Sequence, residues 1–400
     1  MNPAPASQAE IDRQIKELEP EVIRLYRHFH QYPELGFKEF RTAEFIETYL
    51  ADLGLDPFRS AGTGVAAVLD SGKPGPTLML RADMDALPVT EATGLEFASK
   101  NPGVMHACGH DAHMAMLLTA ARVLADHRTF LKGKIKLVFQ PNEEAAGAIY
   151  MIEEGIMENP KVDAAMGIHI WSQLPSGQVG ISSGTVMGGL DVFRLTITGR
   201  GGHTGYPHKA VDPVIAAAGV IQGVQAVQTR EMDAREPTII MFGRLSAGEK
   251  ANIIPEQVTL EGTIRFLAAL PEHSPDNPTQ KFIRICQHIC EAHLCTCNID
   301  IDHENIPLVN DDRMVQMARQ TAVTVFGSPD AVTSSRYIAS EDFSEFSSRV
   351  PGAFMFLGCA DPSKGTDVSH HHPAFAIDES VLTKGVALHV HGALAFLNRK

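Results

Sequence analysis

Residues 103–114, GVMHACGHDAHM, place one cysteine and three histidines within twelve positions. Thiolate, imidazole and carboxylate groups are the ligand types that zinc accepts in proteins. Cys108 and His110 are two positions apart, and in an extended loop this spacing directs both side chains to the same side. Taken alone, the loop would fit a solvated, imidazole-rich turn as well as a metal site, so its surroundings must decide.

Other chemically active side chains directly follow predicted strands. Asp83 and Asp85 come after TLMLRA, Glu143 and Glu144 come after KIKLVFQPN, and His169 comes after AAMGI. Loops beyond the carboxyl ends of strands in an open α/β sheet face one crevice, so we expect these groups to lie together. The 103–110 loop joins them if the helix that follows it packs on the sheet.

Carboxylates that converge in a crevice repel one another and are costly to bury without a positive partner. A metal ion satisfies this requirement, and the segment SHHHPAFAIDE offers more imidazole from His370, His371 and His372. The adjacent pair Glu143 and Glu144 suggests a division of labour, in which one carboxylate binds metal and the other takes a proton from metal-activated water. The reaction class that this predicts is metal-assisted hydrolysis.

The elements that must position these groups alternate between strand and helix. Apolar strand candidates lie at 64–70, 77–83, 134–140 and 164–170, with a helix at about 111–126 and two helices in the first fifty residues that are broken near QYPELG. This alternation predicts a three-layer α/β domain.

From about residue 187 the pattern changes to strand, helix, strand, strand, helix, strand, which is the order of a ferredoxin-like unit. GAFMFLGC and a final helix then return to the first domain. We therefore predict one domain from 1–186 and 303–400, with a second domain, 187–302, inserted into it. A chain of 400 residues is long enough for two hydrophobic cores.

Composition excludes several partners. The formal net charge of -14 and the lack of a Lys/Arg run argue against a nucleic acid or an anionic membrane surface. We find no signal peptide and no apolar run long enough for a membrane span, so we expect a cytoplasmic protein.

Four of the six cysteines, Cys286, Cys290, Cys295 and Cys297, lie in CQHICEAHLCTC together with two histidines. This segment is either a second metal site or a set of small residues packed under an amphipathic helix. The spacing lacks a paired C-x-x-C pattern and its apolar residues recur at helical intervals, which favours packing.

The chain also resembles a known family in an ordered series of motifs: RADMDALPV, GVMHACGHDAHMAMLL, FQPNEE, GIH, GRGGHTGYPHKAVDPV, NIIP, LEGTIR, ASEDF and HHPAF. They are similar to those of the metal-dependent amidohydrolases that include hippurate hydrolase, N-acyl-amino-acid amidohydrolases and plant auxin-conjugate hydrolases. The likeness runs from about residue 20 to 395. It implies a zinc-peptidase-like catalytic domain whose inserted domain acts as a lid and as the surface of a homodimer or higher homo-oligomer.

Carried over by position, the resemblance implies two divalent metal ions, Zn or Mn, with Co or Ni also acceptable. The ligands that it implies are Cys108, His110, Glu144, His169 and His371. Glu143 would be the catalytic base, and Asp83 and Asp85 would support a ligand without binding metal themselves.

In the inserted domain the resemblance implies that His203 steadies the developing oxyanion, within its own subunit or across a dimer. Asn252 and Arg265 match positions that hold a substrate carboxylate, although Arg265 could equally be a strand residue that faces solvent. Two residues depart from the family pattern, Asn142 and Trp171. Both flank predicted ligands and could reshape the substrate pocket, while Trp171 could instead be a core residue.

The leading hypothesis is hydrolysis of the amide bond in an N-acyl or N-aroyl amino acid, such as a hippurate-like small molecule. An alternative uses the same site to cleave dipeptides or to remove an amine from an aromatic ring by hydrolysis. A third hypothesis is a metal-binding protein without catalysis. Such a protein is expected to lack the base or the oxyanion donor, yet Glu143 and His203 are both present.

Overall fold

The computed structural model of the chain describes residues 8–399, which divide into two compact units. The first unit takes the chain up to Gly184, Val309–Ser335 and the chain from Asp342 onward. The second comprises Thr185–Leu308 and Arg336–Glu341. The sequence-based prediction placed the domain boundaries at 186/187 and 302/303, a few residues from the observed 184/185 and 308/309. It did not include the return of residues 336–341 to the second unit.

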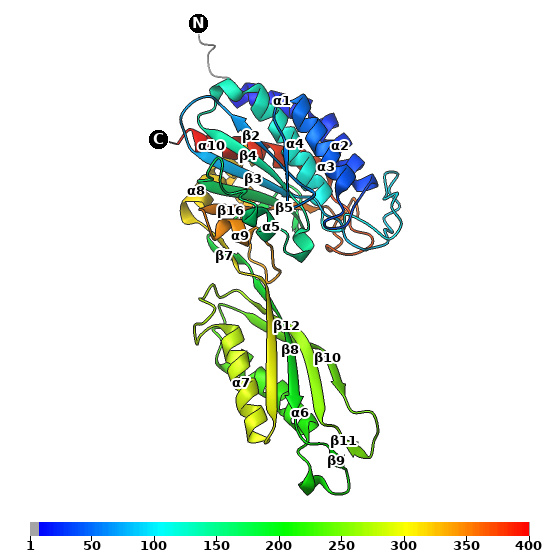
Figure 1. Cartoon of the computed structure of the whole chain (residues 1–400). Coiled ribbons are helices and arrows are strands. Elements are labelled where there is room, and N and C mark those ends of the chain that lie inside the picture. The colour runs from blue at the N-terminus through cyan, green and yellow to red at the C-terminus, as the bar shows by residue number, and fades with distance from the viewer. Residues whose placement is uncertain (1–7, 400) are drawn as a thin grey trace. The chain divides into compact units, whose positions relative to one another are not determined.

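A mixed eight-stranded sheet, in the order β1-β2-β4-β3-β5-β16-β6-β15, forms the centre of the first unit (Figure 1). Its strands are β1 (Phe58–Ser60), β2 (Gly64–Asp70), β3 (Thr77–Asp83), β4 (Lys134–Gln140), β5 (Ala164–Pro175), β6 (Val179–Gly180), β15 (Val332–Thr333) and β16 (Gly352–Ala360). β3 lies between β4 and β5 and is parallel to both. The carboxyl ends of these three strands therefore share one edge.

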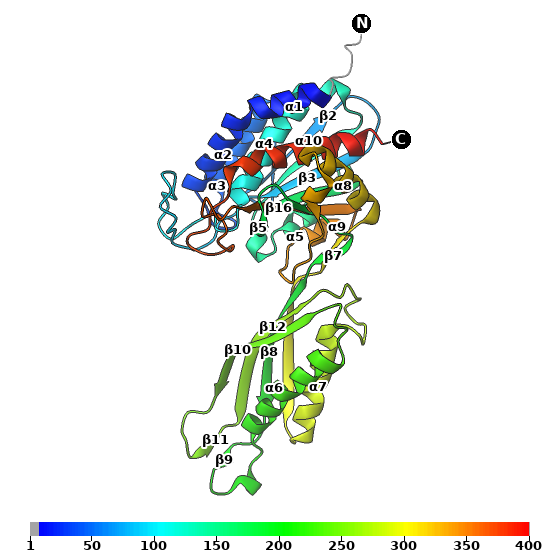
Figure 2. The same cartoon turned by 180° about the vertical axis from the view of Figure 1, so that it is seen from behind.

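The helices of the first unit are α1 (Gln8–Glu17), α2 (Glu19–Gln31), α3 (Phe40–Asp52), α4 (His110–Asp126), α5 (Ala148–Glu153), α8 (Asp312–Phe326), α9 (Ser344–Ser347) and α10 (Leu382–Leu397). Short 3₁₀ turns are η1 (Arg128–Phe130), η2 (Glu143–Ala145), η4 (Pro329–Ala331) and η5 (Glu379–Val381). In Figures 1 and 2, α4 lies between α2 and α10.

Helices contact both faces of this sheet, as the strand alternation of β5 shows. On one face, Ile170 lies near the start of α4 at Gly109 and Met166 contacts Gly392 of α10. On the other face, Gly167 lies against Phe343 beside α9. Successive side chains of a strand point to opposite faces, so α4 and α10 lie on the face opposite to α9.

The first fifty residues differ from the sequence-based prediction. Two helices were expected, but there are three, because the first is divided at Leu18 into α1 and α2. Pro20 stands in the first turn of α2, where its missing N–H costs nothing, and it cannot continue a helix from the preceding turn. The expected break at QYPELG is present between α2 and α3.

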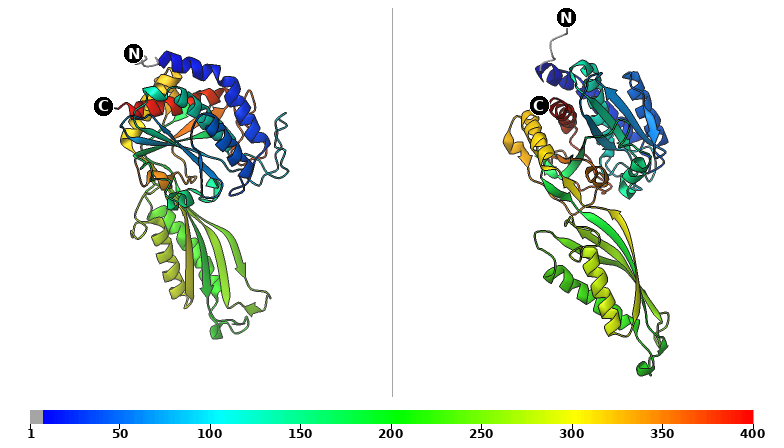
Figure 3. Two further views of the ribbon diagram at one scale, coloured as in Figure 1. Left: turned by 45° about the horizontal axis from the view of Figure 1, so that its top comes forward. Right: turned by 60° about the vertical axis from the view of Figure 1, so that its left-hand side comes forward.

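The second unit is a four-stranded antiparallel sheet in the order β10-β12-β8-β13. Its elements are β8 (Gly189–Thr198), α6 (Pro213–Arg230), β10 (Thr238–Ala247), β12 (Gln257–Phe266), α7 (Pro278–Ala292) and β13 (Thr296–Asn305), with the short β9 (Gly202–His203), η3 (Pro207–Lys209) and β11 (Ile253–Ile254). Figure 3 shows α6 and α7 side by side on one face of this sheet. β7 (Gly184–Met187) and β14 (Leu308–Asn310) carry the chain between the units.

The cysteines of α7, of the start of β13 and of the turn between them pack with apolar residues. Cys286, Cys290 and Cys295 are buried in the core of the second unit, together with Phe282. Within residues 8–399, the groups of three or more metal-ligand side chains that lie close enough to share an ion do not include these cysteines. The core contacts support the packing interpretation of CQHICEAHLCTC.

One segment, Glu379–Leu397, is long and apolar enough to cross a membrane by length and composition alone, contrary to the expectation from the sequence. The segment contains α10, and its most apolar stretch has a mean hydropathy of 1.3 and is 72% buried inside the structure. Such burial is typical of a core helix, and α10 packs against α4 and α8.

Candidate metal centre

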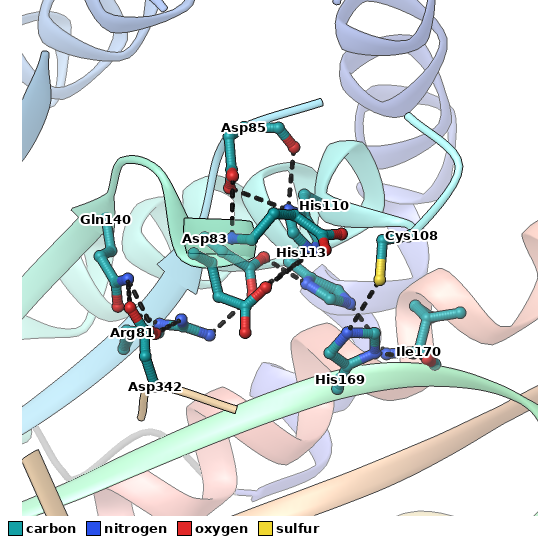
Figure 4. Close-up of polar contacts among 12 residues, drawn as sticks. Arg81, Asp83, Asp85, Cys108, His110, His113, Gln140, His169, Ile170 and Asp342 are labelled. Carbon is teal, nitrogen blue, oxygen red and sulfur yellow. Dashed lines mark hydrogen bonds and ion pairs between the residues drawn. The ribbon is translucent and has the colours of Figure 1, made fainter. Parts of the chain in front are cut away.

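The groups predicted to meet do converge at the carboxyl edge of β3, β4 and β5. Asp83 ends β3, Glu143 and Glu144 follow β4 in the 3₁₀ turn η2, and His169 lies within β5. Cys108 and His110 enter from the start of α4, which contacts β3 and β5 (Figure 4). The strand ends thus account for the convergence of residues that are far apart in the sequence.

His110 is oriented by Asp85. The Nδ1 of His110 lies 2.9 Å from the carbonyl oxygen of Asp85 and 3.2 Å from its carboxylate Oδ1. Because both neighbours are acceptors, Nδ1 carries the proton of the neutral ring, and Nε2 is the nitrogen that a metal can take. This Nε2 is buried and, among residues 8–399, has no hydrogen-bond partner, which suits a metal ligand.

Cys108 and His169 face each other, with 3.5 Å between Sγ and Nε2. The Nδ1 of His169 donates to the carbonyl oxygen of Ile170 at 2.6 Å, which leaves Nε2 as the acceptor nitrogen. Cys108 also forms a close group with His110 and Glu144, whose ligand atoms lie within 4.8 Å of one another. Sulfur, nitrogen and oxygen donors therefore point into one small volume.

The turn that presents the two glutamates is shaped by Asn142. Its backbone is left-handed, with φ of 55°, a conformation that Asn tolerates better than most residues. Its side chain lies over Gly36, where a Cβ would be only 2.0 Å from Asn142 Oδ1, and it donates to Ala145 O at 2.9 Å. Asn142 thus stabilises the turn that contains Glu143 and Glu144, and Glu144 N donates to Asp85 Oδ2 at 3.1 Å.

Of three consecutive histidines, His371 is the one beside the predicted ligands. Its Nε2 lies 3.3 Å from Glu144 Oε1. In contrast, both ring nitrogens of His370 are engaged, by Ser172 Oγ at 3.1 Å and by the Ile170 carbonyl at 2.9 Å. His372 accepts the Ala374 N–H at 3.0 Å. The geometry favours His371 over its neighbours as a ligand.

Asp83 contacts more than one histidine. Its Oδ1 accepts from His113 Nδ1 at 2.5 Å, its Oδ2 accepts from Arg81 at 2.7 Å, and Oδ2 lies 3.8 Å from His110 Nε2. His113 accepts the Ile170 N–H at 2.8 Å through its Nε2. With both nitrogens occupied, His113 supports the site and is not itself a free donor to metal, although it belongs to the same cluster as Asp83, His110 and His169.

Burial and the carboxylates together set the electrostatics of the centre. Burial raises the pKa of the Cys108 thiol well above its usual range, and Glu144 and Glu143 raise it further. Burial alone would lower the pKa of His110, but Asp83 and Asp85 outweigh it and raise that pKa to about 10. Burial and the neighbouring His113 hold the pKa of His169 well below its ordinary value.

The donor set fits one or more divalent cations. Cys108, Glu143 and the partly exposed Glu144 would repel one another as neighbouring anions without a positive partner, and a cation would stabilise the thiolate form of Cys108. The Nε2 of His110 is also buried, 3.9 Å from Glu143 Oε2, and it would offer its lone pair once a cation replaced its proton. Cys108, His110, Glu144, His169 and His371 could supply the ligands, and Glu143, which is 8% exposed, lies beside them.

Trp171 is buried behind this centre. It is 6% exposed, and its ring lies 5.4 Å from that of His169 and 5.0 Å from those of Phe356 and His370, measured between centroids. Its place two residues after His169 on β5 puts it on the same face of the strand. In this structure Trp171 packs against a predicted ligand, and it supports the position of that ring.

The remaining predicted residues belong to the second unit. His203, on β9, is exposed and pairs with Ile253 on β11, next to Asn252. Arg265 lies elsewhere in the unit, on β12, opposite Ile239 and Leu190. The second unit therefore brings His203 and Asn252 together but not Arg265.

Some residues of the centre had not been predicted, namely Arg81, His113, Gln140 and Asp342. His113 was visible in the opening motif, three residues after His110 on one helix face, and Asp342 lies in the ASEDF motif. Arg81 was visible in RADMDALPV, but nothing in its residue type showed that the strand buries it. Only the structure shows that these side chains point inward.

Comparisons with known proteins agree with this chemistry. Residues 79–395 match the model of peptidase family M20/M25/M40. The chain is 37% identical to thermostable carboxypeptidase 1 of Saccharolobus solfataricus, over 96% of this chain and 98% of that protein. It is 38% identical to N-acetyl-L-cysteine deacetylase of Bacillus subtilis, over 92% of this chain and 86% of that protein.

A solved structure from Bacillus subtilis, described as a dinuclear metal-binding peptidase of the M20 family, has a similar fold. It superposes with a TM-score of 0.82 at 30% identity, over 96% of this chain and 99% of that one. The mixed α/β architecture with its central mixed sheet is therefore that of a metal-dependent hydrolase family.

Proposed function

The chain belongs to peptidase family M20/M25/M40, whose members act as hydrolases of C–N bonds, and from this premise we propose that it cleaves the amide bond of N-acyl or N-aroyl amino acids. The observation that carries the proposal is the position of Glu143 beside the donor cluster of Cys108, His110 and Glu144. The deacetylase relative, by its name, acts on an N-acetyl amino acid, whose acetyl group is attached through the same kind of amide bond.

We propose that two divalent ions, zinc or manganese, are held by Cys108, His110, Glu144, His169 and His371. When bound, such ions would polarise the substrate carbonyl and make water more acidic. The Asp85 carboxylate keeps His110 in the tautomer that offers Nε2, and the Ile170 carbonyl does the same for His169.

Glu143 then has the role of a general base and acid. Its carboxylate takes a proton from the attacking water as the water oxygen bonds to the carbonyl carbon. It delivers that proton to the amide nitrogen as the C–N bond breaks, so that a carboxylic acid and a free amine leave. Its neighbour Glu144 is directed towards His371.

We further propose that the second unit serves as a lid and dimer surface and that His203 stabilises the oxyanion. The Nδ1 of His203 accepts the Gly205 N–H at 2.9 Å, so in the neutral ring the proton is on Nε2, which is exposed and can donate. Asn252 and Arg265 lie apart within the second unit, so they would hold one substrate carboxylate together only from the two subunits of a dimer.

The decisive experiment replaces Glu143 with Gln. We expect turnover to fall by about 10²- to 10⁴-fold because the proton carrier is lost, while metal content stays the same. Glu153→Gln, an exposed carboxylate nearby on α5, is the matched control and should retain full activity. A Glu143→Gln protein with turnover within tenfold of the unaltered protein would remove Glu143 from this role.

Peptide cleavage is a second candidate, favoured by the name of the carboxypeptidase relative. It needs the same centre but a different leaving group. A panel of hippurate-like amides, N-acetyl amino acids, dipeptides and aromatic amines, compared by kcat/KM, distinguishes the candidates. Preference for dipeptides or aromatic amines by more than tenfold would replace the leading proposal.

A further inference from the structure

A group of buried polar side chains lies next to the metal centre and has no part in the mechanism above. It consists of Arg81 on β3, Gln140 at the end of β4, and Asp342, the residue at which the chain re-enters the first unit (Figure 4). All three are at most 2% exposed. A buried guanidinium and carboxylate are costly to desolvate, so their presence calls for a specific reason.

Asp342 ties several segments together. Its Oδ1 accepts from Arg81 Nη2 at 2.9 Å, and both of its carboxylate oxygens accept from Gln140 Nε2, at 2.9 and 2.8 Å. Its Oδ2 also accepts from the backbone N–H of Ala148, at the start of α5, at 2.8 Å. Gln140 in turn accepts from Arg81 Nε at 2.8 Å. The ends of β3 and β4 and the start of α5 are thus joined through one carboxylate.

Arg81 continues the chain of contacts towards the metal centre. Its Nη1 donates to Asp83 Oδ2 at 2.7 Å, while Asp83 Oδ1 accepts from His113 Nδ1 at 2.5 Å. The Nε2 of His113 lies 2.8 Å from Ile170 N, and because an amide can only donate, this nitrogen must accept. The ring proton of His113 is therefore on Nδ1, and the contact with Asp83 fixes that tautomer.

Ile170 is the last link before a predicted ligand. Its N–H is held by His113, and its carbonyl oxygen accepts from His169 Nδ1 at 2.6 Å. The second contact sets the rotation of the His169 ring, so that Nε2 faces Cys108 Sγ at 3.5 Å. Any shift of residue 170 would turn this ring away from the other donors.

We propose that Arg81 and Asp342 form a positioning clamp, which acts through Asp83, His113 and the Ile170 backbone to fix the direction of His169. The positive charge of Arg81 balances Asp83, and its planar fork holds Asp83, Gln140 and Asp342 in one arrangement. Arg81 and Asp342 are buried, so we place them out of contact with the substrate. They act through other groups, in the way that outer contacts orient metal ligands in general.

The test compares Arg81→Met with Lys136→Met. Lys136, on the adjacent strand β4, is also a fully buried cation, but its Nζ donates to the carbonyl oxygens of Ile156 and Glu158, outside the clamp. Both replacements remove a buried charge, so both should destabilise the first unit. Only Arg81→Met should weaken the affinity for Zn²⁺, by about 10- to 100-fold in a chelator competition.

Hydrogen exchange gives a readout that needs neither metal nor substrate. In the β5 peptide that contains Ile170, we expect Arg81→Met to speed exchange of the Ile170 amide by at least about tenfold, and Lys136→Met to leave it unchanged relative to the rest of β5. Arg81→Lys keeps the charge beside Asp83 and should restore part of both effects. If Arg81→Met does not fold, the same comparison is made with Asp342→Asn.

Equal effects of Arg81→Met and Lys136→Met on zinc affinity and on exchange would overturn the clamp, as would no effect of Arg81→Met on either. The inference rests on the ligand role proposed above for His169. Should the unaltered protein bind no Zn²⁺, the proposed function fails, and the exchange comparison at Ile170 alone then decides whether the clamp exists.

Discussion

The two units hold their candidate residues in opposite ways. In the first, Asp83, His110 and His113 are at most 1% exposed, and each histidine has its Nδ1 fixed by an oxygen acceptor. In the second, His203 is exposed on the two-residue strand β9, and its one side-chain hydrogen bond within residues 8–399 is the local one with Gly205. The candidate ligands are thus fixed in advance by the interior of the protein, whereas the histidine proposed to meet the substrate stays accessible.

Removal of metal should have the largest effect on activity, and it should change the stability of the first unit and not that of the second. Dialysis against a chelator should abolish hydrolysis and destabilise only the first unit, by about 2.7 kcal/mol relative to protein with metal at 100 times its Kd. Trp171, the one tryptophan of the chain, lies in the first unit, so its fluorescence reports the unfolding of that unit. Undiminished hydrolysis by protein shown to be free of metal would refute the proposed chemistry.

His203→Ala should show that this exposed residue of the second unit contributes to the rate of hydrolysis and not to metal binding. We expect kcat to fall by about 10²- to 10³-fold through loss of an oxyanion donor, with unchanged metal content. His208→Ala, another exposed histidine of the same unit, is the control. If both variants retain the kcat of the unaltered protein, His203 has no catalytic role.

The buried histidine His30 should make the stability of the first unit depend on pH. Burial lowers its pKa, but Asp111 at 2.6 Å and Glu91 at 3.2 Å outweigh this and raise the pKa from 6.5 to about 9. The folded state therefore binds more protons than the unfolded state between these values. The stabilisation is complete below pH 6.5 and is lost as pH rises through about 9.

The size of this effect is at most about 3 kcal/mol in the free energy of unfolding. It is measured by urea unfolding at several pH values, followed by Trp171 fluorescence. Replacement of His30 by Gln should flatten the decline between pH 6.5 and 9. A decline of the same steepness in the variant would assign the pH dependence to other groups.

The smallest effect is expected at Arg265. Arg265→Lys keeps the charge but loses the planar fork, so KM should rise by about tenfold and kcat should stay the same. Steady-state kinetics with a hippurate-like substrate measure both constants. An unchanged KM would favour the alternative in which Arg265 is a strand residue that faces solvent.

Local patterns predicted much of the fold. The strands at 64–70, 77–83 and 134–140 have the expected bounds, because short apolar runs between turn residues indicate buried strands. The helix α8 was not predicted, although Asp311 caps it by accepting from Arg313 N and Met314 N. No sequence pattern showed that 336–341 would return to the second unit, since this depends on contacts between distant segments.

Residue types and strand positions predicted the candidate metal centre. They did not predict the side chains that orient its candidate ligands. The rule that loops gather at the carboxyl ends of strands brought Asp83, Glu143 and His169 together. Arg81 lies two residues before Asp83, so strand alternation alone could suggest that both share a face, but not that Asp342 would meet them. Tautomers and ring directions, such as those of His113, come from tertiary hydrogen bonds.

The interruption of the first unit has a consequence for biosynthesis. Apart from 336–341, the second unit is one continuous stretch, Thr185–Leu308, whereas the first is completed only by the chain from Asp342 onward. During translation the inserted unit can thus reach its fold while its host still lacks β16, α10 and His371. A nascent chain released between residues 169 and 371 would carry four of the five proposed donors, so premature termination should yield a protein with weaker metal binding.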